Sequence, residues 1–279
     1  MSVFVAEELS EVLNTKVVIG RINMGLLNRI IIDDVLLDDQ SGQEMLKVTR
    51  LSAKFDIMPF FKGKISISSV QLFGFNINLR KETPDSPPNF KFVLDAFASK
   101  DTVKKENSLD LRINSILIRR GRMSYHVLSE EETPGKFNAK HIQLQNIIAN
   151  ISLKALSKDS LNLGIKRLSL DEKASGFSLK KMSLKLVANN KQTNIDNFTI
   201  ELPETSLKLD TIHLEYDSLK AFDRFTEQVH FSFRTLPSQV TLKDISPFVP
   251  ILSHFKEPVT LDMEVKGTVD QLTCSHLEI

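Results

Sequence analysis

Apolar and polar residues alternate along most of this chain, and the alternation slips by one residue at recurring places. The repeated unit has eight residues in the order apolar-x-apolar-x-x-apolar-x-apolar, where x is usually polar. Alternation places the apolar side chains on one face of a β-strand. The apolar positions of the seven copies are Ile30, Ile32, Val35, Leu37; Leu46, Val48, Leu51, Ala53; Ile65, Ile67, Val70, Leu72; Leu111, Ile113, Ile116, Ile118; Leu163, Ile165, Leu168, Leu170; Phe177, Leu179, Met182, Leu184; and Leu207, Leu209, Ile212, Leu214.

The slip inside each copy predicts a β-bulge. One extra residue would turn every later side chain to the wrong face unless the strand bulges there. The two residues at the slip are polar in pairs such as Asp33-Asp34, Ser68-Ser69 and Lys180-Lys181. Because repeated bulges bend a sheet, we expect a mainly β fold: an elongated, curved and strongly twisted antiparallel sheet with a few short helices.

Three segments show helical spacing instead, and loops divide the chain. Apolar residues recur at helical intervals in 3–13 and 90–97, and more weakly in 219–225. Prolines at 84, 87 and 88 predict a loop. We therefore expect an N-terminal helix in 1–14, a first part of the β-sheet in 15–83, a loop and short helix inserted at 84–108, and the continuation of the sheet in 109–279.

Composition and charge exclude several classes of protein. The net charge is +1, from 36 basic and 35 acidic residues, which is not the signature of a nucleic-acid-binding protein. The single cysteine cannot form an internal disulfide. The opening residues include Glu7, Glu8, Glu11 and Lys16, which neither a signal peptide nor a membrane-spanning helix would carry there.

The sequence offers no catalytic motif, and it predicts neither an enzyme nor a cofactor. The six histidines lie at least 13 residues apart without the spacing of a helical metal site, so most are expected to be solvated residues on strand faces and no metal is expected. The glycines form no phosphate-binding loop. Asp38-Asp39-Gln40-Ser41-Gly42 predicts a turn rather than a calcium loop, because its carboxylates do not alternate.

A sheet with one apolar face must cover that face, and the few predicted helices are too short to do so. Two alternatives remain open: the sheet covers itself as a β-sandwich, or it curls into an open groove that holds an apolar ligand. The basic stretch Arg119, Arg120 and Arg122 is read as a strand end with its turn, with contact to anionic lipid headgroups as the alternative. The candidate groove-lining residues are Ile30, Ile32, Val35, Leu37, Ile65, Ile67, Val70, Leu72, Phe75, Leu111, Ile113, Ile116, Ile118, Leu163, Ile165, Leu168 and Leu170.

Several segments of the chain resemble sequences of the TamB family in its Bacteroidetes branch. TamB is the large inner-membrane-anchored subunit of the translocation and assembly module. The segments are Thr15 to Ile22, Asn28 to Gly42, Asn89 to Phe97, Leu109 to Ile116 followed by Arg119-Arg120-Gly121, Pro134 to Asn138 with His141-Ile142, and Ser238 to Ile245. These segments have the pattern of β-strands and carry no catalytic motif, so the resemblance indicates a fold and a family rather than a reaction.

The resemblance implies an AsmA-like β-groove in the periplasm, open along one side and apolar within. Its expected roles are phospholipid transport between the inner and outer membranes, outer-membrane protein assembly, or both. It further implies an inner-membrane anchor that precedes this chain and a C-terminal region beyond it that meets an outer-membrane partner of the BamA or TamA type. The expected partners of this part are phospholipid acyl chains, with no nucleic acid.

Overall fold

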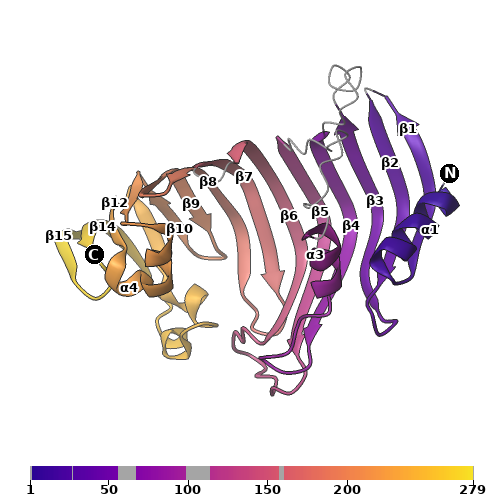
Figure 1. Cartoon of the computed structure of the whole chain (residues 1–279). Coiled ribbons are helices and arrows are strands. Elements are labelled where there is room, and N and C mark those ends of the chain that lie inside the picture. The colour runs from indigo at the N-terminus through magenta and orange to yellow at the C-terminus, as the bar shows by residue number, and fades with distance from the viewer. Residues whose placement is uncertain (1, 27, 56–66, 99–113, 157–159, 279) are drawn as a thin grey trace. The chain divides into compact units, whose positions relative to one another are not determined.

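The structure is a computed structural model of the whole chain that describes residues 2–26, 28–55, 67–98, 114–156 and 160–278. It is mainly β, as the sequence predicts, with one mostly antiparallel sheet of 15 strands and a few short helices (Figure 1). The elements are α1 (Ser2–Leu13), β1 (Val17–Gly25), β2 (Arg29–Asp38), β3 (Glu44–Phe55), β4 (Ile67–Lys81), α3 (Lys91–Ala98), β5 (Ser115–Val127), β6 (His141–Leu156), β7 (Ser160–Glu172), β8 (Ser178–Asn189), β9 (Gln192–Glu201), β10 (Ser206–Leu209), β11 (Ile212–Glu215), η2 (Leu219–Arg224), α4 (Phe225–Gln228), β12 (His230–Arg234), β13 (Ser238–Thr241), η3 (Leu242–Ile245), η4 (Pro250–His254), β14 (Pro258–Gly267) and β15 (Leu272–Glu278).

The strands from β1 to β10 follow one another in the sheet in chain order. The pair β4 and β5 is parallel, unlike the other strand pairs whose register the structure describes. The chain between these two strands contains the expected loop at the prolines and the expected helix, α3. Val70 lies opposite Ile116 and Leu72 opposite Ile118, so two predicted copies of the repeat are neighbours and in phase.

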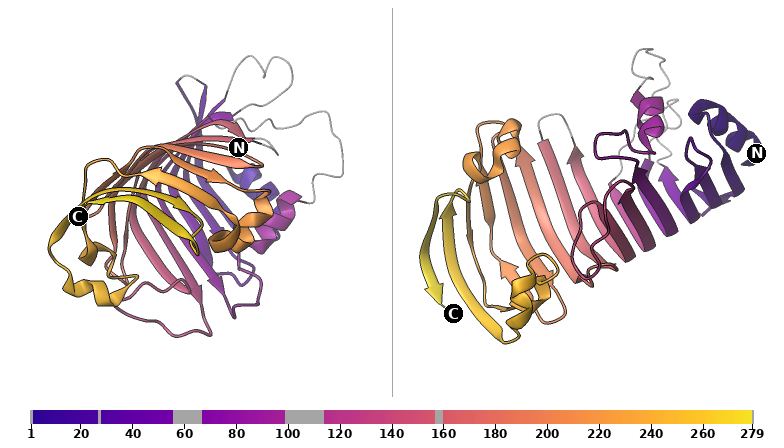
Figure 2. Two further views of the ribbon diagram at one scale, coloured as in Figure 1. Left: turned by 90° about the vertical axis from the view of Figure 1, so that its left-hand side faces the viewer. Right: turned by 90° about the horizontal axis from the view of Figure 1, so that it is seen from below.

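The chain divides into two compact units. The first comprises Met1–Ile148 with Asp171–Ser175, and the second comprises Ala149–Leu170 with Gly176–Ile279. In the first unit, β1 to β5 lie side by side in a single layer, as Figure 1 and the right-hand view of Figure 2 show. Helix α1 packs on the edge strand: the Ser10 hydroxyl accepts the Val17 amide at 3.0 Å, and Ala6 is buried.

The predicted bulges exist in the first unit, and they lie in line across neighbouring strands. Between β2 and β3 the register passes from Asp33 opposite Arg50 to Val35 opposite Val48, leaving Asp34 and Thr49 outside the pairing. Between β3 and β4, Thr49 and Gly74 are passed over in the same way. The slip at Ser68-Ser69 is also present, because the register shifts there by one residue.

Two residues at these bulges, Asp34 and Gly74, adopt the left-handed backbone conformation, with φ of 57° and 63°. Arg120 in β5, Asn146 in β6 and Asn197 in β9 have the same conformation, with φ between 53° and 55°. Asp, Asn and Gly tolerate this region better than other residues. Arginine does not, and the guanidinium of Arg120 lies over a phenylalanine ring in β4, 5.2 Å from its centre.

In the second unit, an interruption of the same kind separates two short strands, β10 and β11, which both pair with β9. Strand β9 pairs with β10 through Phe198–Glu201 and with β11 through Gln192–Ile195. The break at Asp210-Thr211, which the repeat predicts, lies beside Asn197. The slip predicted at Lys180-Lys181 is displaced: the register of β8 and β9 shifts between Ser183 and Lys185, where β9 carries its extra residue.

The helix predictions are confirmed at 3–13, 90–97 and 219–225, where α1, α3 and η2 with α4 occur. The last pair covers a small core of the second unit that contains Tyr216, Ala221 and Val229. The Tyr216 hydroxyl donates to the Asn189 carbonyl at 2.7 Å and lies 2.9 Å from the Thr193 hydroxyl.

The turn predicted at 38–42 is confirmed, and its carboxylate already has partners. Asp39, 2% exposed, accepts the amides of Ser41 and Gln43 and bonds the side chains of Arg80 and Asn89. Burial alone would raise the pKa of Asp39, but the hydrogen bonds from Ser41, Asn89 and Gln43 outweigh it and hold the pKa below its usual value. Asp39 therefore ties the β2–β3 turn to the end of β4.

We predict that Gly121→Ala destabilises the first unit. A β-carbon at Gly121 would lie 2.4 Å from the Phe75 ring and 3.0 Å from the Ile147 β-carbon. Overpacking of this kind costs about 1–3 kcal/mol. Urea unfolding of the single variants and of Phe75→Leu/Gly121→Ala measures it: the double variant should lose less than the sum of the two single losses. Additive losses would contradict the contact.

We predict that Asp39→Asn lowers stability by about 2 kcal/mol at pH 7, because hydrogen bonds to the charged carboxylate are lost. Since the folded-state pKa is depressed, this stabilisation is complete above the unfolded value of 3.8 and disappears as the pH falls through the folded value. Urea titrations from pH 7 to pH 3 should show the difference from the wild type narrowing. Asp34→Asn, at an exposed position, is the control. A difference independent of pH would contradict the prediction.

Candidate functional site

The most extensive chemical feature of the first unit is one entirely apolar face of its sheet. Directly opposed residues lie on the same face, so the strand register defines rows of side chains that run across the strands. Four such rows are apolar at every position. They are Met24, Ile30, Ala53, Val70 and Ile116; Ile22, Ile32, Leu51, Leu72 and Ile118; Ile19, Val35, Val48 and Phe75; and Val17, Leu37, Leu46, Ile77 and Met123. We call this set the apolar face.

Burial on the apolar face is greatest along the line of bulges. Ile19, Val48 and Phe75, which are next to the bulge in their strands, are 8%, 4% and 7% exposed. On the other side of the same line, Asp34, Thr49 and Arg120 are exposed.

Most other residues of the apolar face are only half-buried, among them Ile32, Leu51, Leu72 and Ile118. In the core of a sandwich, a facing sheet would bury the whole of these side chains. Within the described part of the first unit, every strand belongs to the one sheet and lies in its single layer (Figure 2). The apolar face is therefore partly accessible.

The opposite face of the same strands carries the charged side chains, together with some apolar ones such as Ile31, Leu36 and Leu117. One of its rows reads Arg21, Asp33, Arg50, Phe73 and Arg119 from β1 to β5. The Arg50 Nε donates to Asp33 Oδ1 at 2.6 Å, and this hydrogen bond holds the pKa of Asp33 below its usual value. These residues surround an open depression of about 770 Å³. We call this side the polar face.

The structure corrects the interpretation of Arg119, Arg120 and Arg122 as a strand end with its turn. All three lie in the middle of β5, which runs on to Val127. Arg119 pairs with Phe73 and Arg122 with Asn76, which places both on the polar face, and Arg120 is at the bulge. None of the three projects from the apolar face.

The other predicted groove residues are distributed as follows. Those of β2, β4 and β5 that the structure describes all lie on the apolar face: Ile30, Ile32, Val35, Leu37, Val70, Leu72, Phe75, Ile116 and Ile118. Ile65, Leu111 and Ile113 lie outside the described residues, and of Ile67 only the backbone, in β4, is described. Leu163, Ile165, Leu168 and Leu170 are half-buried residues of β7 in the second unit.

Sequence reasoning missed the contribution of β1 to the apolar face. Its residues Val17, Ile19, Ile22 and Met24 have the spacing of the repeated unit, with Gly20-Arg21 at the slip. The signal was therefore present in the sequence.

Sequence reasoning also missed a group of two histidines and a glutamate, His126, His141 and Glu132. The expectation that histidines are solvated is wrong for His141, which is 7% exposed. Helical spacing could not reveal this pair, because strand pairing brings the two residues together.

Comparison with known proteins gave no match, either to a protein family or to a curated protein. In the described part of the chain, no helix is both long and apolar enough to cross a membrane.

Proposed function

We propose that the apolar face of the first unit is the floor of an open groove that binds the acyl chains of phospholipids, and that the protein conducts lipid between membranes. The observation that supports this proposal is the set of four apolar rows, three of which cross five strands and one of which crosses four. Such a surface suits a ligand that is apolar along its whole length. A contiguous, accessible apolar surface of this kind is typical of a binding site for an apolar partner.

The dimensions of the apolar face suit an acyl chain. Five strands about 4.8 Å apart give rows roughly 19 Å long. A lipid tail spans half of a hydrocarbon core about 30 Å thick, which is about 15 Å. If the groove covers half of the surface of a 16-carbon chain, the gain is about 6 kcal/mol at half of about 0.8 kcal/mol per methylene. Binding of this strength holds a lipid yet permits release.

The composition of the two faces favours lipid over a protein strand as ligand. An incoming strand of an outer-membrane protein would pair by its backbone at a sheet edge and would bring alternating polar side chains. At the N-terminal edge, α1 already occupies part of β1 through Ser10. The apolar face offers such a strand no polar partner, whereas an acyl chain needs none.

This proposal agrees with the resemblance to the TamB family. In that interpretation the chain is an N-terminal periplasmic part of an inner-membrane-anchored protein, and assembly partners bind elsewhere in the protein. Lipid headgroups would remain in water at the open side of the groove. The arginines at 119 and 122 are on the polar face and take no part in holding them.

We predict that Ile118→Asp reduces the lipid retained by the purified protein several-fold, because a carboxylate on the apolar face must either lose its hydration or exclude the acyl chain. Leu117→Asp is the matched control, since Leu117 is the adjacent, half-buried residue and points to the polar face. Mass spectrometry of extracted phospholipids and thermal melting are measured for both variants.

The two measurements separate the groove from the self-covered β-sandwich. In an open groove the carboxylate can tilt toward water, so both variants should keep a cooperative melting transition. In a closed core, Ile118→Asp would abolish that transition while Leu117→Asp would not. That result, or lipid retention unchanged by Ile118→Asp, would overturn the proposal.

A further inference from the structure

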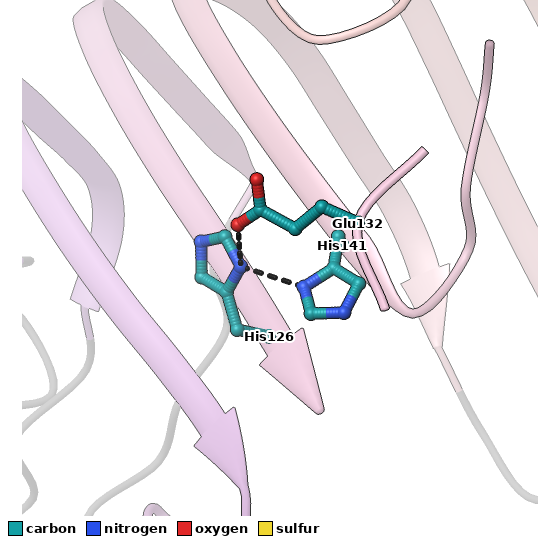
Figure 3. A group of neighbouring side chains, drawn as sticks. All are labelled: His126, Glu132 and His141. Atoms are coloured by element: carbon teal, nitrogen blue, oxygen red, sulfur yellow. Dashed lines mark hydrogen bonds and ion pairs between the residues drawn. The ribbon is translucent and has the colours of Figure 1, made fainter. Parts of the chain in front are cut away.

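Two histidines and a glutamate meet where β5 ends and β6 begins, as Figure 3 shows. His126 comes from β5, Glu132 from the loop and His141 from the first position of β6. The Nδ1 atoms of the two histidines are 3.0 Å apart, and Glu132 Oε1 is 4.0 Å from Nδ1 of His126. Each of the three residues offers one possible metal-ligand atom, and these three atoms all lie within 4.8 Å of one another.

Hydrogen bonding fixes which nitrogen of His141 is available. Its Nε2 lies 2.9 Å from the backbone carbonyl of Glu130. A carbonyl only accepts, so Nε2 must carry the proton, and in the neutral ring the lone pair is then on Nδ1. That lone pair points to His126. A metal-binding histidine is usually oriented in this way, by a hydrogen bond from its other ring nitrogen to a carbonyl or carboxylate oxygen.

We propose that His126, His141 and Glu132 bind one divalent transition-metal ion of the zinc class. Two nitrogens bound to the same tetrahedral zinc at about 2.0–2.1 Å would be roughly 3.3 Å apart, close to the separation found here. Glu132 is exposed, with 62% of its side chain accessible, so its carboxylate can move the short distance to a common ion. Two imidazoles and a carboxylate form a donor set typical of zinc.

The surrounding backbone holds the two histidines in place without the ion. The Val127 amide donates to the Lys140 carbonyl at 2.9 Å, and the His141 amide donates to the Asn138 carbonyl at 3.0 Å. His126 also borders an open depression of about 480 Å³, lined by Ser124, Gln143 and others. An ion and a water molecule, as fourth ligand, can enter from that side.

Two of the nearby cations are paired with carboxylates other than Glu132. Arg80, the cross-strand neighbour of His126, places its guanidinium 2.7 Å from the Asp39 carboxylate. Lys140 pairs with the carboxylate of Glu130 at 2.6 Å. Glu132 is thereby left as the carboxylate beside the histidines. A bound ion would attach the loop 128–140 to the ends of both strands.

The experiment titrates the tag-free, chelator-treated full chain with Zn²⁺ by calorimetry, and with Co²⁺ by its visible absorption. We expect one ion per chain and a higher melting temperature with Zn²⁺ than without it. His126→Gln and His141→Gln should each weaken binding at least about 100-fold, since loss of even an outer partner costs about 10–100-fold. Glu132→Gln, at an exposed residue, should weaken it about 10-fold while the fold is kept.

His213→Gln is the matched control. His213 lies 3.0 Å from a Glu215 carboxylate oxygen and 2.5 Å from the side-chain oxygen of Asn194, with no second histidine in that group. It should leave affinity and stoichiometry unchanged. Absence of stoichiometric binding would overturn the proposal and would show that the two rings share only a hydrogen bond. Binding that survives in Glu132→Gln and in both histidine variants would also overturn it, because the ion would then be held elsewhere.

Discussion

The alignment of the bulges across neighbouring strands is the constraint on which the first unit depends. A bulge in one strand alone would put that strand out of phase with both neighbours and send its later side chains to the wrong face. Here Asp34, Thr49 and Gly74 leave the pairing at the same level. The phase is therefore restored on every strand, and the apolar face continues unbroken on both sides of the line of bulges.

Residues beside the line of bulges supply much of the buried surface of this layer. Val48 and Phe75 are almost completely buried, although every described strand of the first unit lies in one sheet. Gly121 leaves room for the Phe75 ring, since any larger residue there would overlap it. The polar face contributes through charge pairs such as Asp33 with Arg50, in which Asp33 is buried and more than half of the Arg50 side chain is exposed.

The fold was largely readable from the sequence, because alternation and its slips are local features. The slips at Asp33-Asp34 and Asp210-Thr211 correspond to real interruptions. The parallel pairing of β4 with β5 was not readable, since the pattern of a strand does not encode its direction. Nor was the position of Arg119 within its strand: a run of charges is equally typical of a turn and of a solvated strand face.

The group of His126, Glu132 and His141 could not be predicted from the sequence for a different reason. His126 and His141 are 15 residues apart, and their meeting depends on the length of the loop and on the register of the strands that flank it. Such non-local geometry leaves no periodic signal.

The two sites proposed for the first unit occupy different environments because of the same alternation. His126 follows Tyr125 and precedes Val127, whose side chain is 3% exposed, so His126 projects to the polar face. An acyl chain and a metal ion would thus lie on opposite sides of one layer. Polar ligands can bind on the polar face without any change in the residues of the apolar rows, since successive side chains of a strand point to opposite faces. The bulges preserve this separation of the two faces along the full length of each strand.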